Sequence, residues 1–197
     1  MQKKSIISLT GFAFTMVTVT VLSIVSCKKE EKVVTPAPPG NEFLTTTILT
    51  CINSVAPFDT VVGTWRDLTP DDTIPPDTSH AILNLKKNSV YRVQVGLLDE
   101  TKTPAGDIGA DILSRGNYHL FCFTTSSSLG GNLTVTRTDH DTNNPPLAIG
   151  LQDNFTTINT CDGALEVILR HQPNVKNGSC DPGSTDLDVN FQIHIIN

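Results

Sequence analysis

The chain has 197 residues, of which 17% are charged and 38% hydrophobic, with 14 basic residues, 20 acidic residues and a formal net charge of −6. An acidic chain is a poor candidate for binding nucleic acid, because that binding depends on Lys and Arg side chains that neutralise phosphates. The same acidity argues against binding to anionic lipid headgroups.

An apolar segment opens the chain: Lys3 and Lys4 precede an uncharged run from Ser5 to Ser26, which ends at Cys27. About 20 apolar residues are enough to span a bilayer. A basic start, an apolar core and small residues before a cut site are typical of a secretory signal. The stretch Ile24–Cys27 resembles the bacterial lipobox, whose cysteine is lipidated and becomes the new N-terminus. We therefore predict a signal peptide over 1–26 and lipidation of Cys27, with an uncleaved transmembrane anchor as the alternative.

A tether is predicted next, because residues 27–41 combine charged and proline-rich stretches. The cluster Lys28–Lys32 resembles the signal that sends lipoproteins of the Bacteroidetes to the outer cell surface, and it equally suits the start of a solvated linker. Removing the signal peptide removes two lysines, so 12 basic and 20 acidic residues remain, a net charge of −8. The length that remains predicts one folded domain, over 42–197.

Alternation of apolar and polar residues with a period of two dominates this domain and indicates β-strands. The clearest runs are Tyr91–Leu97, Leu165–Leu169 and Leu187–Ile195. Further strands are expected at 43–52, 60–68, 79–85, 117–125, 132–138 and 147–152, with one short helical turn between 107 and 116. The pattern predicts an all-β fold, an immunoglobulin-like two-sheet antiparallel sandwich of about eight or nine strands.

Four cysteines remain after Cys27, an even number that suits disulfides in an oxidising compartment. Four cysteines allow three connectivities. We predict Cys51–Cys122 and Cys161–Cys180, with buried free thiols as the alternative. A zinc site is disfavoured because no two of these cysteines have the C-x-x-C spacing of metal knuckles.

Two polar groups are candidate sites. The first comprises His171, Asn174, Asp186 and Asp188, which could hold a ligand or metal. A hydrogen-bonded structural corner is the favoured interpretation of this group. The second comprises Asp139, Asp141 and Asn143, whose alternation is that of a calcium loop. The glycine and distal glutamate of an EF-hand are missing, so a polar hairpin turn is favoured, and we expect no metal and no cofactor.

The chain resembles a family of small, uncharacterised lipoproteins of the Bacteroidetes, each a signal peptide followed by one β domain. Two of the matching stretches are the most specific, Arg170–Asn174 and Gly183–Phe191. Thr69–Asp72 and Ser184 depart from the family, whose members often carry an acidic, glycine-rich loop and a glutamate at those places. The other matching stretches are 42–46, 66–68, 121–123 and 132–135. The resemblance implies a fold and an outer-membrane location and brings no known activity.

These observations favour a binding or accessory module that contacts an outer-membrane protein partner. The alternative is capture of a metal ion or a surface glycan. Trp65, the only tryptophan, lies in an expected strand, and the scarcity of exposed aromatic rings disfavours glycan capture. Catalytic sequence motifs such as Gly-x-Ser-x-Gly or His-Glu-x-x-His do not occur, so an enzyme is not predicted, and a hydrolase is the least favoured reading.

Overall fold

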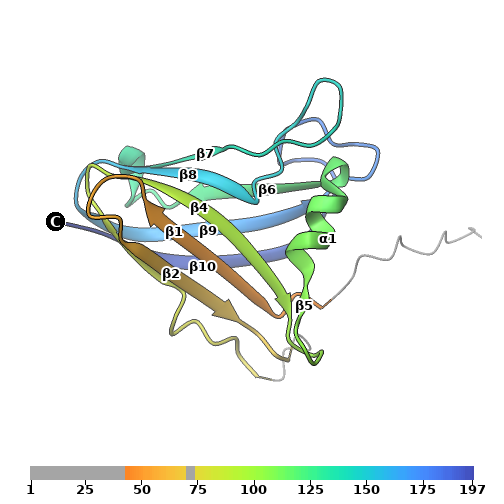
Figure 1. Ribbon diagram of the computed structural model, residues 1–197, viewed down its shortest axis with the longest axis horizontal. Helices are drawn as coiled ribbons and strands as arrows, with labels where there is room; N and C mark the ends of the chain where they lie inside the picture. The colour runs from red at the N-terminus through yellow and green to blue at the C-terminus, as the bar shows by residue number, and fades with distance from the viewer. Residues whose placement is uncertain (1–42, 70–73) are drawn as a thin grey trace, which may run out of the picture. The chain divides into compact units, whose positions relative to one another are not determined.

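Ten strands form two packed sheets in the structure, a computed structural model that describes residues 43–69 and 74–197 (Figure 1). The predicted signal peptide, Cys27 and the tether lie outside the described residues. Sheet A has the strand order β2-β1-β4-β8-β7, and β5 pairs with β4. Its strands are β1 Thr46–Asn53, β2 Thr60–Arg66, β4 Val90–Asp99, β5 Gly106–Asp107, β7 Leu133–Arg137 and β8 Gln152–Thr157.

Sheet B has the order β3-β10-β9-β6. Its strands are β3 Ile82–Lys86, β6 His119–Thr125, β9 Cys161–His171 and β10 Ser184–Ile196. The predicted all-β sandwich is confirmed. Pairing is antiparallel except between β3 and β10, which run parallel. The two-residue strand β5 was not predicted from the sequence.

The core lies between the sheets because each long strand turns alternate side chains inward. On β4 these are Tyr91, Val93, Val95 and Leu97, each at most 3% exposed. Burying one such large side chain contributes roughly 1.5–3 kcal/mol. Facing them, the core also contains Leu165, Val167, Leu169, Val189, Phe191 and Ile193. Trp65 packs against this core, as its position in an expected strand predicted.

The expected helical turn is the helix α1, Ile108–Ser114. Asp107 caps its N-terminus by accepting a hydrogen bond from the Ala110 backbone N–H at 3.1 Å. Two 3₁₀ turns follow, at Gly116–Tyr118 and Gly130–Asn132. Among the described residues, no helix combines the length and the apolar character needed to cross a bilayer.

The prediction of a strand at 147–152 is wrong. Residues 147–151 run beside β6 instead, where the Ile149 carbonyl accepts a hydrogen bond of 2.7 Å from the Phe121 backbone N–H. The strand in this region is β8, Gln152–Thr157, whose inward positions are Asp153, Phe155 and Thr157. Because two of these three side chains are polar, the alternation of the strand cannot be recognised in the sequence.

The predicted disulfides are wrong as well. Cys122 pairs with Cys180, 58 residues further along the chain, while Cys51 and Cys161 are free thiols. Phe121 and Phe123 face the core, so Cys122 lies on the outer surface of sheet B. Cys51 is 0% exposed inside the sandwich. The predicted Cys51–Cys122 bridge would therefore have to cross a sheet. The predicted Cys161–Cys180 bridge does not form, because Cys180 is bonded to Cys122.

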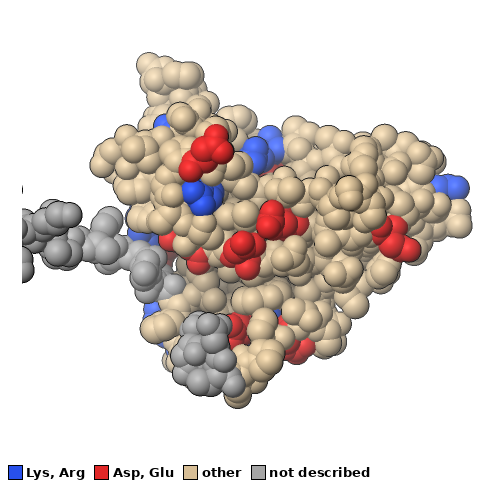
Figure 2. Space-filling model, turned by 180° about the vertical axis from the view of Figure 1, so that it is seen from behind, with Lys and Arg blue, Asp and Glu red and all other residues tan. Residues whose placement is uncertain are grey.

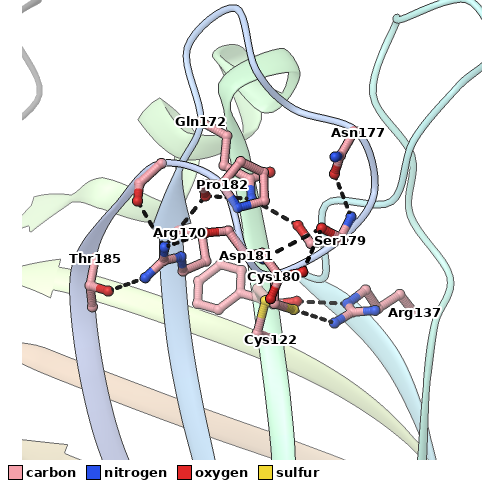
Figure 3. The surroundings of a disulfide bond; sticks show 12 residues. Cys122, Arg137, Arg170, Gln172, Asn177, Ser179, Cys180, Asp181, Pro182 and Thr185 are labelled. Atoms are coloured by element: carbon pink, nitrogen blue, oxygen red, sulfur yellow. Dashed lines mark hydrogen bonds between the residues drawn. A yellow bond between two sulfur atoms is a disulfide. The ribbon is translucent and has the colours of Figure 1, made fainter.

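Residues 172–183, which we call the excursion, cover the outer surface of β6 and β9 at this disulfide (Figure 3). Arg170 donates hydrogen bonds to the carbonyls of Asp181, at 3.1 Å, and Gly183, at 2.8 Å. Gly183 has φ +86°, and a Cβ there would lie 2.1 Å from the His171 carbonyl oxygen. This close approach requires glycine and brings the chain back into β10.

Candidate functional site

Two histidines lie side by side at one end of sheet B. His119 begins β6 and His171 ends β9, and the two residues are paired across the antiparallel ladder. Their rings stack with centroids 4.9 Å apart and planes inclined by 8°. Both occupy inward positions, because His119 continues the alternation of Phe121 and Phe123, and His171 that of Leu169.

Asp186 joins this pair through a bulge in β10. The pairing register of β10 with β9 shifts between Thr185 and Leu187, which leaves Asp186 as an extra residue in the strand. Its carboxylate oxygen Oδ2 lies 3.9 Å from His119 Nε2. Burial raises the pKa of Asp186, and the neighbouring His171, Arg115 and Arg170 oppose that rise. We call His119, His171 and Asp186 the His–His–Asp corner.

His119 is held in its neutral form. The residue is 1% exposed, and this burial lowers the pKa of its imidazole to about 4. The hydrogen bond to the Arg115 carbonyl opposes the lowering, and electrostatic interaction with His171, Arg115 and Lys176 adds to it. Nδ1 lies 3.0 Å from the Arg115 carbonyl oxygen. A carbonyl only accepts hydrogen bonds, so Nδ1 carries the proton and Nε2, which faces Asp186, is unprotonated.

Acid should destabilise the protein through His119. In the unfolded chain a histidine takes up a proton below about pH 6.5, whereas folded His119 resists protonation until about pH 4. The stability from neutral His119 is thus complete above pH 6.5 and is lost as pH falls towards 4, by about 3 kcal/mol at most. We expect the free energy of unfolding of His119→Gln, measured in urea, to fall less steeply between about pH 6.5 and pH 4 than that of the natural protein.

His80, which is exposed, provides the matched control for that measurement. His80→Gln should leave the decline unchanged, because the His80 side chain is not buried in the core. If the free energies of unfolding of the natural protein and His119→Gln fell in parallel with pH, buried neutral His119 would not be the source of the acid sensitivity.

The structure places only part of the predicted corner together. His171 and Asp186 both lie beside His119, but Asp188 is exposed on the opposite face of β10. Asn174 is exposed in a turn of the excursion and has φ +61°. His119 was missed, although it lies two residues before inward-facing Phe121 in an expected strand. That spacing was the signal that could have found it.

In the acidic loop around Asp139 and Asp141, the two carboxylates accept hydrogen bonds from backbone N–H groups of the protein. Asp139 accepts hydrogen bonds from the backbone N–H groups of Gly150, at 2.7 Å, and Leu151, at 3.0 Å. Asp141 accepts them from the backbone of Leu147, at 2.8 Å. These are the bonds of an ordered turn. Across 43–69 and 74–197, no three His, Cys, Asp or Glu side chains are grouped so that they could hold a metal ion.

Asn143, the third residue proposed in this loop, also bonds to Asp141. Its backbone N–H donates to Asp141 Oδ1 at 3.0 Å, and its side-chain amide donates to Oδ2 at 2.8 Å. The Asn143 side chain therefore acts as a donor to a carboxylate of its own loop.

An ion pair that the sequence did not reveal joins this loop to the excursion. Lys176 Nζ lies 2.8 Å from Asp141 Oδ2, and the two side chains are 2% and 0% exposed. Nζ also donates to the Gly116 carbonyl at 2.8 Å. Burial alone would raise the pKa of Asp141, but the hydrogen bonds from Lys176 and the loop backbone outweigh it and lower that pKa.

A second buried acid lies inside the sandwich. Asp153 is 2% exposed, and neither of its carboxylate oxygens has a hydrogen-bond partner among the described residues. Burial, with help from the charge of Asp139, raises the pKa of Asp153 to about 8, although Arg137 acts in the opposite direction. Asp153 is therefore mostly protonated at neutral pH. Its burial without partners makes it a destabilising element of the core.

Exposed apolar side chains gather at the end of the sandwich where β1 meets β2. We call them the distal patch: Ile52, Val55, Phe58, Val62 and Val90, which are 37%, 53%, 74%, 53% and 37% exposed. Ile52 lies diagonally from Val62 on β2 and from Val90 on β4, on the same outer face of sheet A. The Ser54 backbone N–H donates to the Val90 carbonyl at 2.8 Å, which joins the β1–β2 turn to β4.

Charged side chains are sparse on the outer face of the middle of sheet A. The outward side chains of the described strands β1, β4, β7 and β8 include one charged group, Arg92, while Arg66 of β2 and Asp107 of β5 lie at the margin. On sheet B, the outward positions of β9 and β10 include Asp162, Glu166 and Asp188, together with Arg170. The view from behind shows acidic side chains across the middle of the visible face (Figure 2).

Comparison with protein-family models, curated proteins and solved structures found no match to this chain.

Proposed function

We propose that this protein is a lipid-anchored binding module of a bacterial outer membrane, which acts by contacting a protein partner. The lipobox-like Ile24–Cys27 supports the anchor, and the chain after it supports a tether of about 15 residues. The observation that carries the binding role is the distal patch. Exposed apolar residues scattered singly are ordinary on a surface, but here Ile52, Val62 and Val90 share one outer face of sheet A, and Val55 and Phe58 lie in the adjoining β1–β2 turn.

The position of the distal patch supports this role. The described chain begins at Phe43, before β1, and the patch begins at Ile52, near the end of β1. A strand of eight residues spans about 27 Å at roughly 3.4 Å per residue. Figure 1 shows β1 running between these two ends of the sandwich. The first described residues and the distal patch thus lie at opposite ends of β1.

The His–His–Asp corner is the basis of the alternative, capture of a metal ion or small ligand. His119 is 1% exposed, so a ligand could reach its ring only after local opening. His119 also uses Nδ1 for the Arg115 carbonyl. These contacts favour a structural role for the corner, which links the C-terminal end of α1 and the bulge of β10 to the start of β6. The same enclosure disfavours a hydrolase built on these histidines.

Loss of the anchor is the direct test of location. We expect Cys27→Ala to move the protein from the membrane fraction to the soluble fraction of its own cells, because each buried lipid methylene contributes about 0.8 kcal/mol to binding. Labelling with a radioactive fatty acid should disappear as well. Cys161→Ala is the matched control, since it removes a free thiol and should change neither result.

Two outcomes would contradict the proposal at different points. Retention of Cys27→Ala in the membrane would favour an uncleaved transmembrane segment. A cross-linked pull-down of the natural protein from intact cells tests the partner. Recovery of one protein in stoichiometric yield, only with the anchor present, is expected, and recovery of none would overturn the binding role.

A further inference from the structure

Arg92 lies beside the distal patch with its charge uncompensated. It is exposed on β4, directly opposite Ile52 of β1 and two residues from Val90 on the same face. Within the described chain, no carboxylate pairs with its guanidinium and no acceptor receives a hydrogen bond from it. It lines a shallow pocket of about 280 Å³ together with Thr50, Ile52, Val93, Gln94 and Gln152.

The surroundings of Arg92 have the composition of an interface core. Such cores are depleted in Lys, Glu and Asp and enriched in aromatic residues and Arg. Phe58 is the most exposed large apolar side chain among the described residues, at 74%. Arg92 is the only charged residue facing outward from β1, β4, β7 and β8 in the same part of the chain. Arginine is one of the residues enriched at the few positions that dominate binding energy in many interfaces.

Charge selects the kind of partner. A mature chain of net charge −8 repels acidic surfaces in general, so an acidic group can approach favourably only where a local cation faces it. Arg92 is such a cation, and its planar guanidinium is suited to a bidentate bond with a carboxylate. A glycan would be expected to stack on exposed rings, and the single ring of Phe58 offers no extended platform.

We propose that the distal patch and Arg92 form the docking site for a partner protein that presents an apolar surface and a carboxylate aligned with Arg92. The inference rests on the proposed function and deepens it by naming the surface and the partner chemistry. Phe58, Ile52 and Val62 pack against the apolar surface of the partner. Arg92 forms the central ion pair, which becomes stronger as the surrounding contacts exclude water.

The test uses the full-length protein in its own cells, with a photoreactive benzoyl-phenylalanine at Val62 and, as a control, at Asn190 on the outer face of sheet B. We expect one protein adduct from position 62 and none from position 190. Phe58→Ser should reduce the adduct about tenfold or more, as for an anchor residue. Phe43→Ser is the matched control, because Phe43 is 60% exposed at the other end of β1, and its adduct should be unchanged.

Ile52 and Ile82 provide a second matched pair, since both are 37% exposed, one on each sheet. Ile52→Ser should weaken the adduct, and Ile82→Ser should not. Arg92→Glu should abolish it, and changing one carboxylate of the identified partner to lysine should restore it. Circular dichroism of each purified variant establishes that the sandwich is retained, as expected for exposed positions.

The outcomes separate this inference from the proposed function. A partner recovered from the natural protein but cross-linked from position 190, or unaffected by Phe58→Ser and Arg92→Glu, would overturn the docking site and leave the binding role intact. An adduct that resists protease and is removed by glycosidases would identify a glycan and overturn the inference. An adduct between two copies of this chain would overturn it as well. Recovery of no partner at all would overturn both.

Discussion

Replacing Lys176 by methionine should lower the free energy of unfolding by about 3–5 kcal/mol, which is the cost of leaving a buried charge without its partner. The Lys176 side chain is 2% exposed, and its ammonium group lies 2.8 Å from Asp141. Methionine fills similar volume, so the loss arises from the charge rather than from a cavity. Equilibrium unfolding in urea at pH 7, followed by circular dichroism, measures the difference.

Two variants make this result interpretable. Lys87→Met removes an exposed lysine and should change stability by less than about 0.5 kcal/mol. The double variant Lys176→Met with Asp141→Asn should recover part of the loss, because the orphaned carboxylate is neutralised while its acceptor oxygen is kept. A double variant less stable than Lys176→Met alone would show that the pairing is not the source of the effect.

Removing the disulfide should have an effect of similar size. Cys122 and Cys180 are separated by 58 residues, and closing a loop of that length in the unfolded chain accounts for roughly 4 kcal/mol on the chain-entropy model. We expect Cys122→Ser to unfold at correspondingly lower urea concentration. A reducing agent should destabilise the natural protein by the same amount and leave Cys122→Ser unaffected.

Cys161→Ser is the control for this experiment, since Cys161 is a free thiol at a half-buried position. The connectivity can also be read directly. Alkylation of the unreduced, denatured protein followed by peptide mass spectrometry should label Cys51 and Cys161 and leave Cys122 and Cys180 joined. Labelling of Cys122 or Cys180 would contradict the bond.

Much of the sandwich could be predicted because its long strands bury one face and expose the other. The runs around Tyr91, Leu165 and Leu187 alternate cleanly, and all three are strands of the structure. The run at 147–151 has the same apolar character but pairs through single bonds at the edge of β6 and with Asp139. Composition alone does not distinguish a chain that lies along a sheet edge from one inside the ladder.

The candidate sites were harder to predict because they depend on contacts between distant segments. His119 and His171 are 52 positions apart in sequence and become neighbours only through the register of β6 with β9. Asp186 lies beside His119 because of a bulge in β10, and the local sequence of β10 does not predict that bulge. The cysteine pairing was hard to predict for the same reason, since Cys122 and Cys180 are 58 residues apart. Alternation around Phe121 could have excluded an inward Cys122, but it could not have placed Cys180 above it.

The place of β10 in sheet B has a consequence for the order in which the chain can fold. β10 is the last strand in sequence, yet it lies between β3 and β9 and pairs with both. As the chain is synthesised from its N-terminus, β6 can pair with β9, but β3 has no partner in sheet B until residues 184–196 have been made. Contacts that close over such long separations form slowly. Completion of this sheet is therefore deferred until the last strand is available.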